Sequence, residues 1–137
     1  MMQGSSIIRP NQIASILALY EGEDDSIVIL ATVSVELVRS IDGYDWVGFY
    51  RLVGPGLLKI SRYQGGNSFP NITLERGVSG VAAQQWAIQL IDDVDLFKGH
   101  IAWSGSTKSE LVIPCFNQGG WLLGVLDIGW YQLYFFT

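Results

Sequence analysis

The hydrophobic pattern changes its period about one third of the way along the chain, and this change limits the folds that the sequence can adopt. Before residue 43, apolar residues recur three or four positions apart, which predicts one helix after Pro10 and a second one capped by Asp24 or Asp25. The second segment is rich in β-branched residues that favour strands locally, but its pattern persists far beyond the usual strand length of about 5–6 residues. The predicted apolar stripe of this helix is Ile27, Leu30, Ser34, Leu37, Val38 and Ile41.

The rest of the chain consists of short apolar runs separated by glycine-containing turns, which is typical of strands. A short helix is expected over residues 81–86 and a long loop over residues 95–108. Helices followed by mostly adjacent strands predict an α+β fold, with a central antiparallel sheet of about five or six strands flanked by helices. The predicted strands are residues 45–53, 57–63, 88–94, 110–116 and 121–128, the first two joined in a hairpin by Gly54-Pro55-Gly56.

The composition excludes several classes of protein. A chain of 137 residues with 49% hydrophobic residues suits one folded domain, residues 1–137, and excludes disorder. One cysteine and one histidine exclude a disulfide scaffold and a conventional zinc or iron–sulfur site, so no metal and no cofactor is predicted. A net charge of -5 argues against nucleic acid and membrane as partners. The first residues do not resemble a signal peptide and no apolar run is long enough for a membrane span, so we expect a cytoplasmic protein.

Aromatic residues alternate with a glycine along the first predicted strand. Trp46, Gly48, Tyr50 and Leu52 share one face, because side chains on a strand alternate between its two faces. Two rings separated by a glycine could leave a slot for a small flat or sulfur-bearing group. The alternative, which the pattern alone favours, is that the rings fill the core and that Gly48 permits close packing.

Two carboxylates near the end of the chain are candidates for binding. Asp127 is predicted on the same face as Trp121, Leu123 and Val125, and a buried carboxylate is costly unless it is paired or hydrogen-bonded. Either a network of backbone amides satisfies Asp127 or it awaits a cationic ligand. Glu110, at the mouth of the neighbouring strand, could supply a second carboxylate for a ligand amino group, or could be a solvated strand-end residue.

Three other polar residues have weaker signals. The segment from Arg76 to Gly80 places backbone N–H groups at a helix start, where Ser79 could bind an anion or cap the helix. His100 lies in a loop where a structural, hydrogen-bonded histidine is expected rather than a catalytic base. Cys115 lies within an apolar strand and is expected to act as a small buried hydrophobe.

Seven spaced motifs together resemble the free methionine-(R)-sulfoxide reductases, which are single GAF domains, and the match spans about residues 26–128. The resemblance implies a GAF-like fold with about six antiparallel strands, a homodimer, and repair of oxidised free methionine in the cytoplasm. The motifs are Tyr44-Asp45-Trp46-Val47-Gly48-Phe49-Tyr50, Gln64-Gly65, Arg76-Gly77-Val78-x-Gly80-x-Ala82, Asp93-Val94, Phe97-x-Gly99-His100-Ile101-Ala102, Ser109-Glu110-Leu111-Val112-x-Pro114 and Gly124-Val125-Leu126-Asp127-Ile128.

The sequence departs from this family at the residues that carry its chemistry. The family uses cysteine thiols to attack the sulfoxide and to resolve the sulfenic intermediate as a disulfide. The three matching positions are Phe69, Ser79 and Trp103 in this chain, and Cys115 falls where the family has an apolar residue. None of the three replacements provides a thiolate, so the resemblance implies no catalytic residue and little or no reductase activity.

The residues that contact the substrate in the family are better kept. Trp46, Tyr50, Glu110 and Asp127 match those positions, whereas a further acidic position is Gly129. Residues 129–137 form an aromatic tail in place of the family's C-terminal helix. We therefore expect a domain that binds a small molecule, such as free methionine sulfoxide or another amino-acid-like ligand, through these four residues and Ser79. The alternatives are a dimerisation module with a vestigial pocket and, less favoured, an active reductase.

Overall fold

A computed structural model describes residues 22, 24–40, 44–66, 68–97 and 107–133. In this part of the chain, six strands form one antiparallel sheet in the order β3-β2-β1-β6-β5-β4, which confirms the predicted α+β arrangement. The elements are α2 (Ser26–Ser40), β1 (Tyr44–Gly54), β2 (Leu57–Gly65), β3 (Asn71–Thr73), α3 (Gly77–Gln85), β4 (Gln89–Ile91), the 3₁₀ helix η1 (Val94–Leu96), β5 (Ser109–Phe116) and β6 (Leu122–Trp130).

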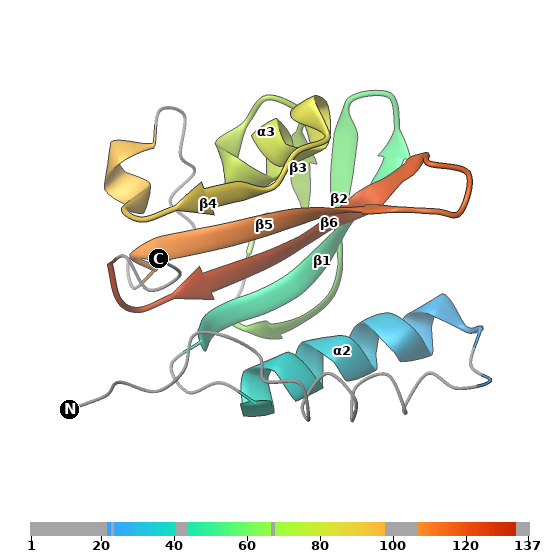
Figure 1. Ribbon diagram of the computed structural model, residues 1–137, viewed down its shortest axis with the longest axis horizontal. Coiled ribbons are helices and arrows are strands. Elements are labelled where there is room, and N and C mark those ends of the chain that lie inside the picture. Colours follow the sequence, from blue (N-terminus) through green and yellow to red (C-terminus); the bar gives the residue numbers. More distant parts are fainter. Residues whose placement is uncertain (1–21, 23, 41–43, 67, 98–106, 134–137) are drawn as a thin grey trace.

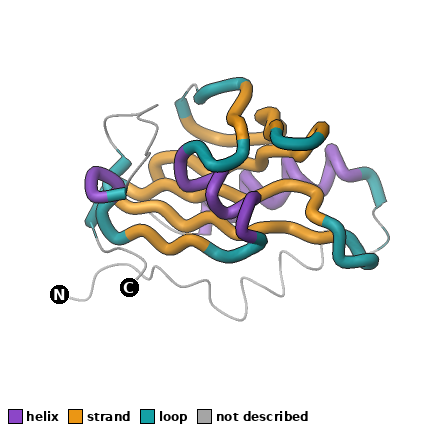
Figure 2. Tube along the Cα trace, turned by 90° about the horizontal axis from the view of Figure 1, so that it is seen from above, coloured by secondary structure: helices purple, strands orange, loops and turns teal. Residues whose placement is uncertain are grey.

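The two α-helices cover opposite faces of the sheet (Figure 1), and in Figure 2 α3 lies in front of the strands and α2 behind them. Helix α2 contacts β1 and β2, whereas α3 contacts β3, β4, β5 and β6. Each helix therefore has its own apolar core. The larger one, on the α3 face, includes Trp46, Tyr50 and Val125, and the smaller one, on the α2 face, includes Leu37 and Val47. No helix in the described residues is both long and apolar enough to cross a membrane.

Helix α2 begins where the sequence predicts. The Asp25 side chain accepts a hydrogen bond from the backbone N–H of Ile27 at 2.9 Å, as expected of an N-terminal cap. Ser34 and Leu37 are buried in the predicted stripe, but Ile27 is 54% exposed, so the stripe begins one turn later. The helix predicted after Pro10 and the end of the stripe at Ile41 lie outside the described residues.

The predicted hairpin of β1 and β2 is confirmed, but two edge strands differ from expectation. Strand β3 was not expected, since three residues with one buried side chain, Ile72, are too few for a recognisable alternation. Strand β4 ends at Ile91 rather than at Val94. The Asp93 side chain accepts a hydrogen bond from the backbone N–H of Asp95 at 3.0 Å and starts η1, which ends the extended segment early.

Because of a bulge in β6, the first residues of this strand face other sides of the sheet than the sequence predicts. Cys115 pairs with Gly124 and Phe116 pairs with Leu122, so Leu123 is an extra residue on β6. Leu122 consequently shares the α3-side core with Val125, whereas Leu123 is 54% exposed. The strict alternation that placed Leu123 on the face of Asp127 is therefore wrong.

Candidate functional site

Stacked aromatic rings form one wall of the site on the α3 face. The indole of Trp46 stacks on the ring of Tyr50, with centroids 5.9 Å apart, and on that of Tyr63, with centroids 5.3 Å apart. A Cβ added at Gly48 would lie 2.5 Å from a ring carbon of Trp46. The indole itself thus covers the bare backbone of Gly48, and the close-packing alternative is correct in place of an open slot.

The polar atoms of these rings hold the chain that follows β2. The indole N–H of Trp46 donates a hydrogen bond to the carbonyl of Gly66 at 3.0 Å. The hydroxyl groups of Tyr50 and Ser68 hydrogen bond at 2.6 Å, and Tyr50 also donates to the carbonyl of Phe69 at 3.4 Å. Burial raises the pKa of Tyr50 above its usual value, so its hydroxyl stays protonated at neutral pH.

The two candidate carboxylates are buried together beside these rings. Glu110 on β5 is 3% exposed and Asp127 on β6 is 1% exposed, which excludes the alternative that Glu110 is a solvated strand-end residue. They come from neighbouring strands, and a hydrogen bond to Asp127 is one of the causes that raise the pKa of Glu110. Burial, and then the negative charge of Asp127, raises the pKa of Glu110 well above its usual value. The pair therefore retains one proton in a pH range where exposed carboxyl groups have lost theirs.

Ser79 contacts the carboxyl pair from α3, the helix that packs on this face of the sheet. Its hydroxyl donates a hydrogen bond of 2.5 Å to Oδ2 of Asp127. It therefore does not cap α3, which begins at Gly77 with no side-chain cap, four residues before the start expected at residue 81. Gly80 permits this approach, because a Cβ there would lie 2.7 Å from the carbonyl oxygen of Thr73.

The structure thus brings the five predicted ligand-contacting side chains into one cluster. Trp46 of β1 and Glu110 of β5 lie opposite the same residue of β6, Gly129, and Asp127 lies opposite Gly48, which places the acids beside the ring wall. The cluster carries two carboxyl groups and two hydroxyls in a buried environment, so it is suited to a ligand that is positive and donates hydrogen bonds. Its members are Trp46 and Tyr50 from β1, Ser79 from α3, Glu110 from β5 and Asp127 from β6.

The other candidates lie elsewhere. Phe69 is 40% exposed at the end of the segment that Tyr50 holds, and His100 and Trp103 lie outside the described residues. Cys115 lines a cavity on the opposite face of the sheet with Leu30 of α2, and burial raises the pKa of its thiol. No group of three or more His, Cys, Asp or Glu side chains in the described residues could hold a metal ion.

Two members of the site were not predicted. Tyr63 stacks on Trp46 because it lies opposite Gly48 in the register of β1 and β2. The predicted hairpin of the first two strands, with Gly48 in the first, could have indicated that Tyr63 lies opposite this glycine. Ser68 lies in a polar turn of the sequence, where no pattern distinguishes it from its neighbours.

Relatives of known sequence connect this chain to a family. The "GAF domain-containing protein A" of Dictyostelium discoideum is 38% identical over 118 residues, which cover 86% of this chain and 73% of that protein. The "Free methionine-R-sulfoxide reductase" of Escherichia coli is 36% identical over 111 residues, covering 81% of this chain and 66% of the enzyme. No family model matches the sequence.

Solved structures agree with these relatives. The reduced form of the fRMsr of Staphylococcus aureus superimposes with a TM-score of 0.89 and 33% identity, over 97% of this chain and 85% of that one. The free methionine-R-sulfoxide reductase of Neisseria meningitidis, solved in complex with its substrate, gives a TM-score of 0.83 and 28% identity, over 98% and 83% of the two chains. This chain belongs to the family of GAF-domain proteins that includes the free methionine-R-sulfoxide reductases.

Proposed function

We propose that this GAF domain binds a small, amino-acid-like molecule at the Glu110–Asp127 pair and has little or no reductase activity. The observation that carries the proposal is the burial of both carboxyl groups beside the Trp46 ring, with the Ser79 hydroxyl on Asp127. Burying two acids together destabilises a fold, so their presence here favours a role in binding. The complex of the Neisseria meningitidis relative with its substrate supports free methionine sulfoxide as the first ligand to test.

The chemistry of such a ligand fits the cluster. An ammonium group would meet the single negative charge that the pair carries while it retains one proton, and it would donate to carboxylate oxygens already removed from water. The sulfur-bearing side chain would pack against the aromatic wall. Because the Trp46 ring covers Gly48, entry of the ligand would require the rings to move and the hydrogen bond from Trp46 to Gly66 to open.

The proposal predicts that binding depends on the buried acids. We expect Asp127→Asn and Glu110→Gln each to weaken binding of free methionine sulfoxide by about tenfold or more, as for loss of a charge-assisted hydrogen bond in a buried site. Isothermal titration calorimetry at pH 7 measures the dissociation constants.

The matched control is Glu75→Gln, which removes one negative charge from an exposed side chain and should leave the affinity unchanged. If Glu75→Gln weakens binding as much as the two other variants do, the loss of affinity is due to the overall charge of the protein, which would contradict the proposal. No binding by the unaltered protein at millimolar ligand, together with a stable dimer in light scattering, would favour the alternative of a dimerisation module.

The proposal also predicts that thiol-dependent turnover is absent. The chain has one cysteine, so it cannot form the intramolecular disulfide that resolves a sulfenic intermediate, and Cys115 faces away from the carboxyl pair. We expect no consumption of free methionine-(R)-sulfoxide above background in an assay coupled to thioredoxin. Turnover that survives Cys115→Ser would contradict the thiol argument, because that variant has no thiol at all.

A further inference from the structure

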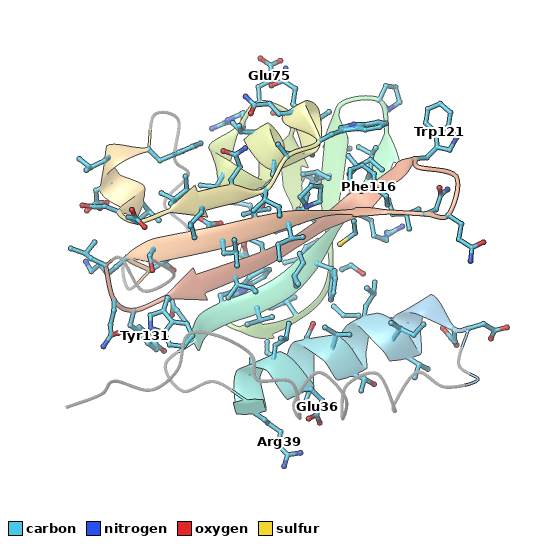
Figure 3. All side chains as sticks on the ribbon, viewed as in Figure 1. Glu36, Arg39, Glu75, Phe116, Trp121 and Tyr131 are labelled. Atoms are coloured by element: carbon cyan, nitrogen blue, oxygen red, sulfur yellow. The ribbon has the colours of Figure 1, made fainter. Side chains whose placement is uncertain are left out.

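A second space lies on the other face of the sheet, between α2 and the strands. It consists of two adjoining cavities of about 350 and 420 Å³, which share Leu30 of α2 and Arg51 of β1 in their walls. We call these two cavities the α2 groove. Each volume is within the range of about 300–1,000 Å³ typical of small-molecule sites. The groove is separated from the Glu110–Asp127 pair by the sheet itself, as the two layers of side chains in Figure 3 illustrate.

One half of the groove is apolar because of the backbone beneath it. Gly124 forms part of its wall, and any side chain there would collide with the carbonyl oxygen of Tyr50, since a Cβ would lie 2.0 Å away. The strand therefore leaves bare backbone at this point. Apart from Arg51, the side chains around it are aliphatic, aromatic or thiol groups, namely Leu30, Phe49, Cys115 and Leu123.

The other half of the groove carries two positive charges. Arg51 lies on the α2 face of β1, and an irregularity in β2, where Tyr50 pairs with Ile60 and Gly48 with Tyr63, adds an extra residue beside Arg62. Both arginines line the cavity of about 420 Å³. No acidic side chain of the described residues forms an ion pair with either of them, although the whole chain has a net charge of -5.

We propose that the α2 groove binds an amphipathic anion, with its carboxylate at Arg51 and Arg62 and its apolar chain beside Leu30, Leu123 and Cys115. Arginine guanidinium groups suit carboxylates because their planar donors match the two oxygens. Leu30 and Arg51 line both cavities, so one molecule with a short apolar chain could contact the arginines and the apolar wall together. This site is independent of the ligand proposed for Glu110 and Asp127.

The only cysteine of the chain reports on occupancy of the groove. Cys115 lines the apolar half, so a bound chain should slow its alkylation by N-ethylmaleimide. The experiment uses the protein at pH 8.5, because burial raises the pKa of the thiol and a higher pH supplies more of the reactive thiolate. Decanoate is the probe, and decanol is the uncharged comparison. We expect decanoate to slow the reaction at least fivefold and decanol, at equal concentration, to have less than half that effect. Calorimetry with decanoate provides a second measurement.

Charge-removing variants distinguish the proposed site from nonspecific binding. We expect Arg51→Gln and Arg62→Gln each to weaken decanoate binding by about fivefold, the upper range for exposed ion pairs. Arg39→Gln, in the last turn of α2, removes the same charge from a residue that does not line the groove and should have no effect.

Three results would overturn the proposal. If decanoate changes neither the alkylation rate nor the heat measured by calorimetry, the groove does not bind it. If decanol protects Cys115 as well as decanoate does, the arginines have no role in binding. Alkylation that slows with increasing protein concentration, and on which decanoate has no effect, identifies a second copy of this chain as the occupant instead.

Discussion

Gly48→Ala should be among the most destabilising single changes in the protein, lowering the free energy of unfolding by about 3 kcal/mol, the upper range for overpacking a core. The added Cβ would lie 2.4 Å from the Cβ of Tyr63 and 2.5 Å from the ring of Trp46. The Cβ of Tyr63 is fixed to the backbone of β2, so the strain cannot be relieved by a rotamer change of that residue alone. Urea unfolding followed by circular dichroism measures the loss.

The same strand provides a control for this substitution. Gly54, the last residue of β1, has no atom within 4 Å of its added Cβ and no positive φ. Gly54→Ala should therefore leave stability unchanged, or raise it by about 0.4–1 kcal/mol by restricting the unfolded chain. If the two variants unfold at the same urea concentration, the close contact between Gly48 and the Trp46 indole is not what stabilises this part of the core.

Much of the sheet could be predicted because its central strands are long and alternate regularly. The side chains of Trp46 and Tyr50 share the face that alternation from Tyr44–Gly54 predicts, and the turn after Gly54 sets their pairing with β2. The prediction is wrong where local backbone geometry interrupts the alternation. The bulge at Leu123 reverses which of the first residues of β6 face the core, and nothing in the apolar sequence around it marks the extra residue.

The site could be predicted only in part, for a related reason. A carboxylate at Asp127, between apolar strand neighbours, indicates burial from the sequence alone. The sequence does not decide whether Glu110 is buried, because a strand end can be solvated or covered. Whether it is covered depends on packing between distant parts of the chain. Likewise, the bond from Ser79 to Asp127 joins residues 48 positions apart and competes with the local capping role that a serine at a helix start usually has.

The buried acid pair also predicts an unusual dependence of stability on pH. Folding raises the pKa of Glu110 above its value of about 4.5 in an unfolded chain. Between these two pKa values the folded chain binds more protons at this residue than the unfolded chain does. The contribution of Glu110 to stability is therefore constant below pH 4.5 and decreases as the pH rises toward the raised pKa, by up to about 1.4 kcal/mol per pH unit.

Glu110→Gln should remove this dependence, because the amide resembles the protonated carboxyl group and can still donate to Asp127. We expect the variant and the unaltered protein to be equally stable near pH 4 and the variant to be increasingly more stable toward pH 8, as measured by urea unfolding across this range. Glu75→Gln, at an exposed position, should show no such divergence. A difference that stays flat with pH would mean that Glu110 titrates normally in the folded protein. If the variant gains this stability and also loses affinity for methionine sulfoxide, the acid is retained at the expense of stability, as expected of a residue kept for binding.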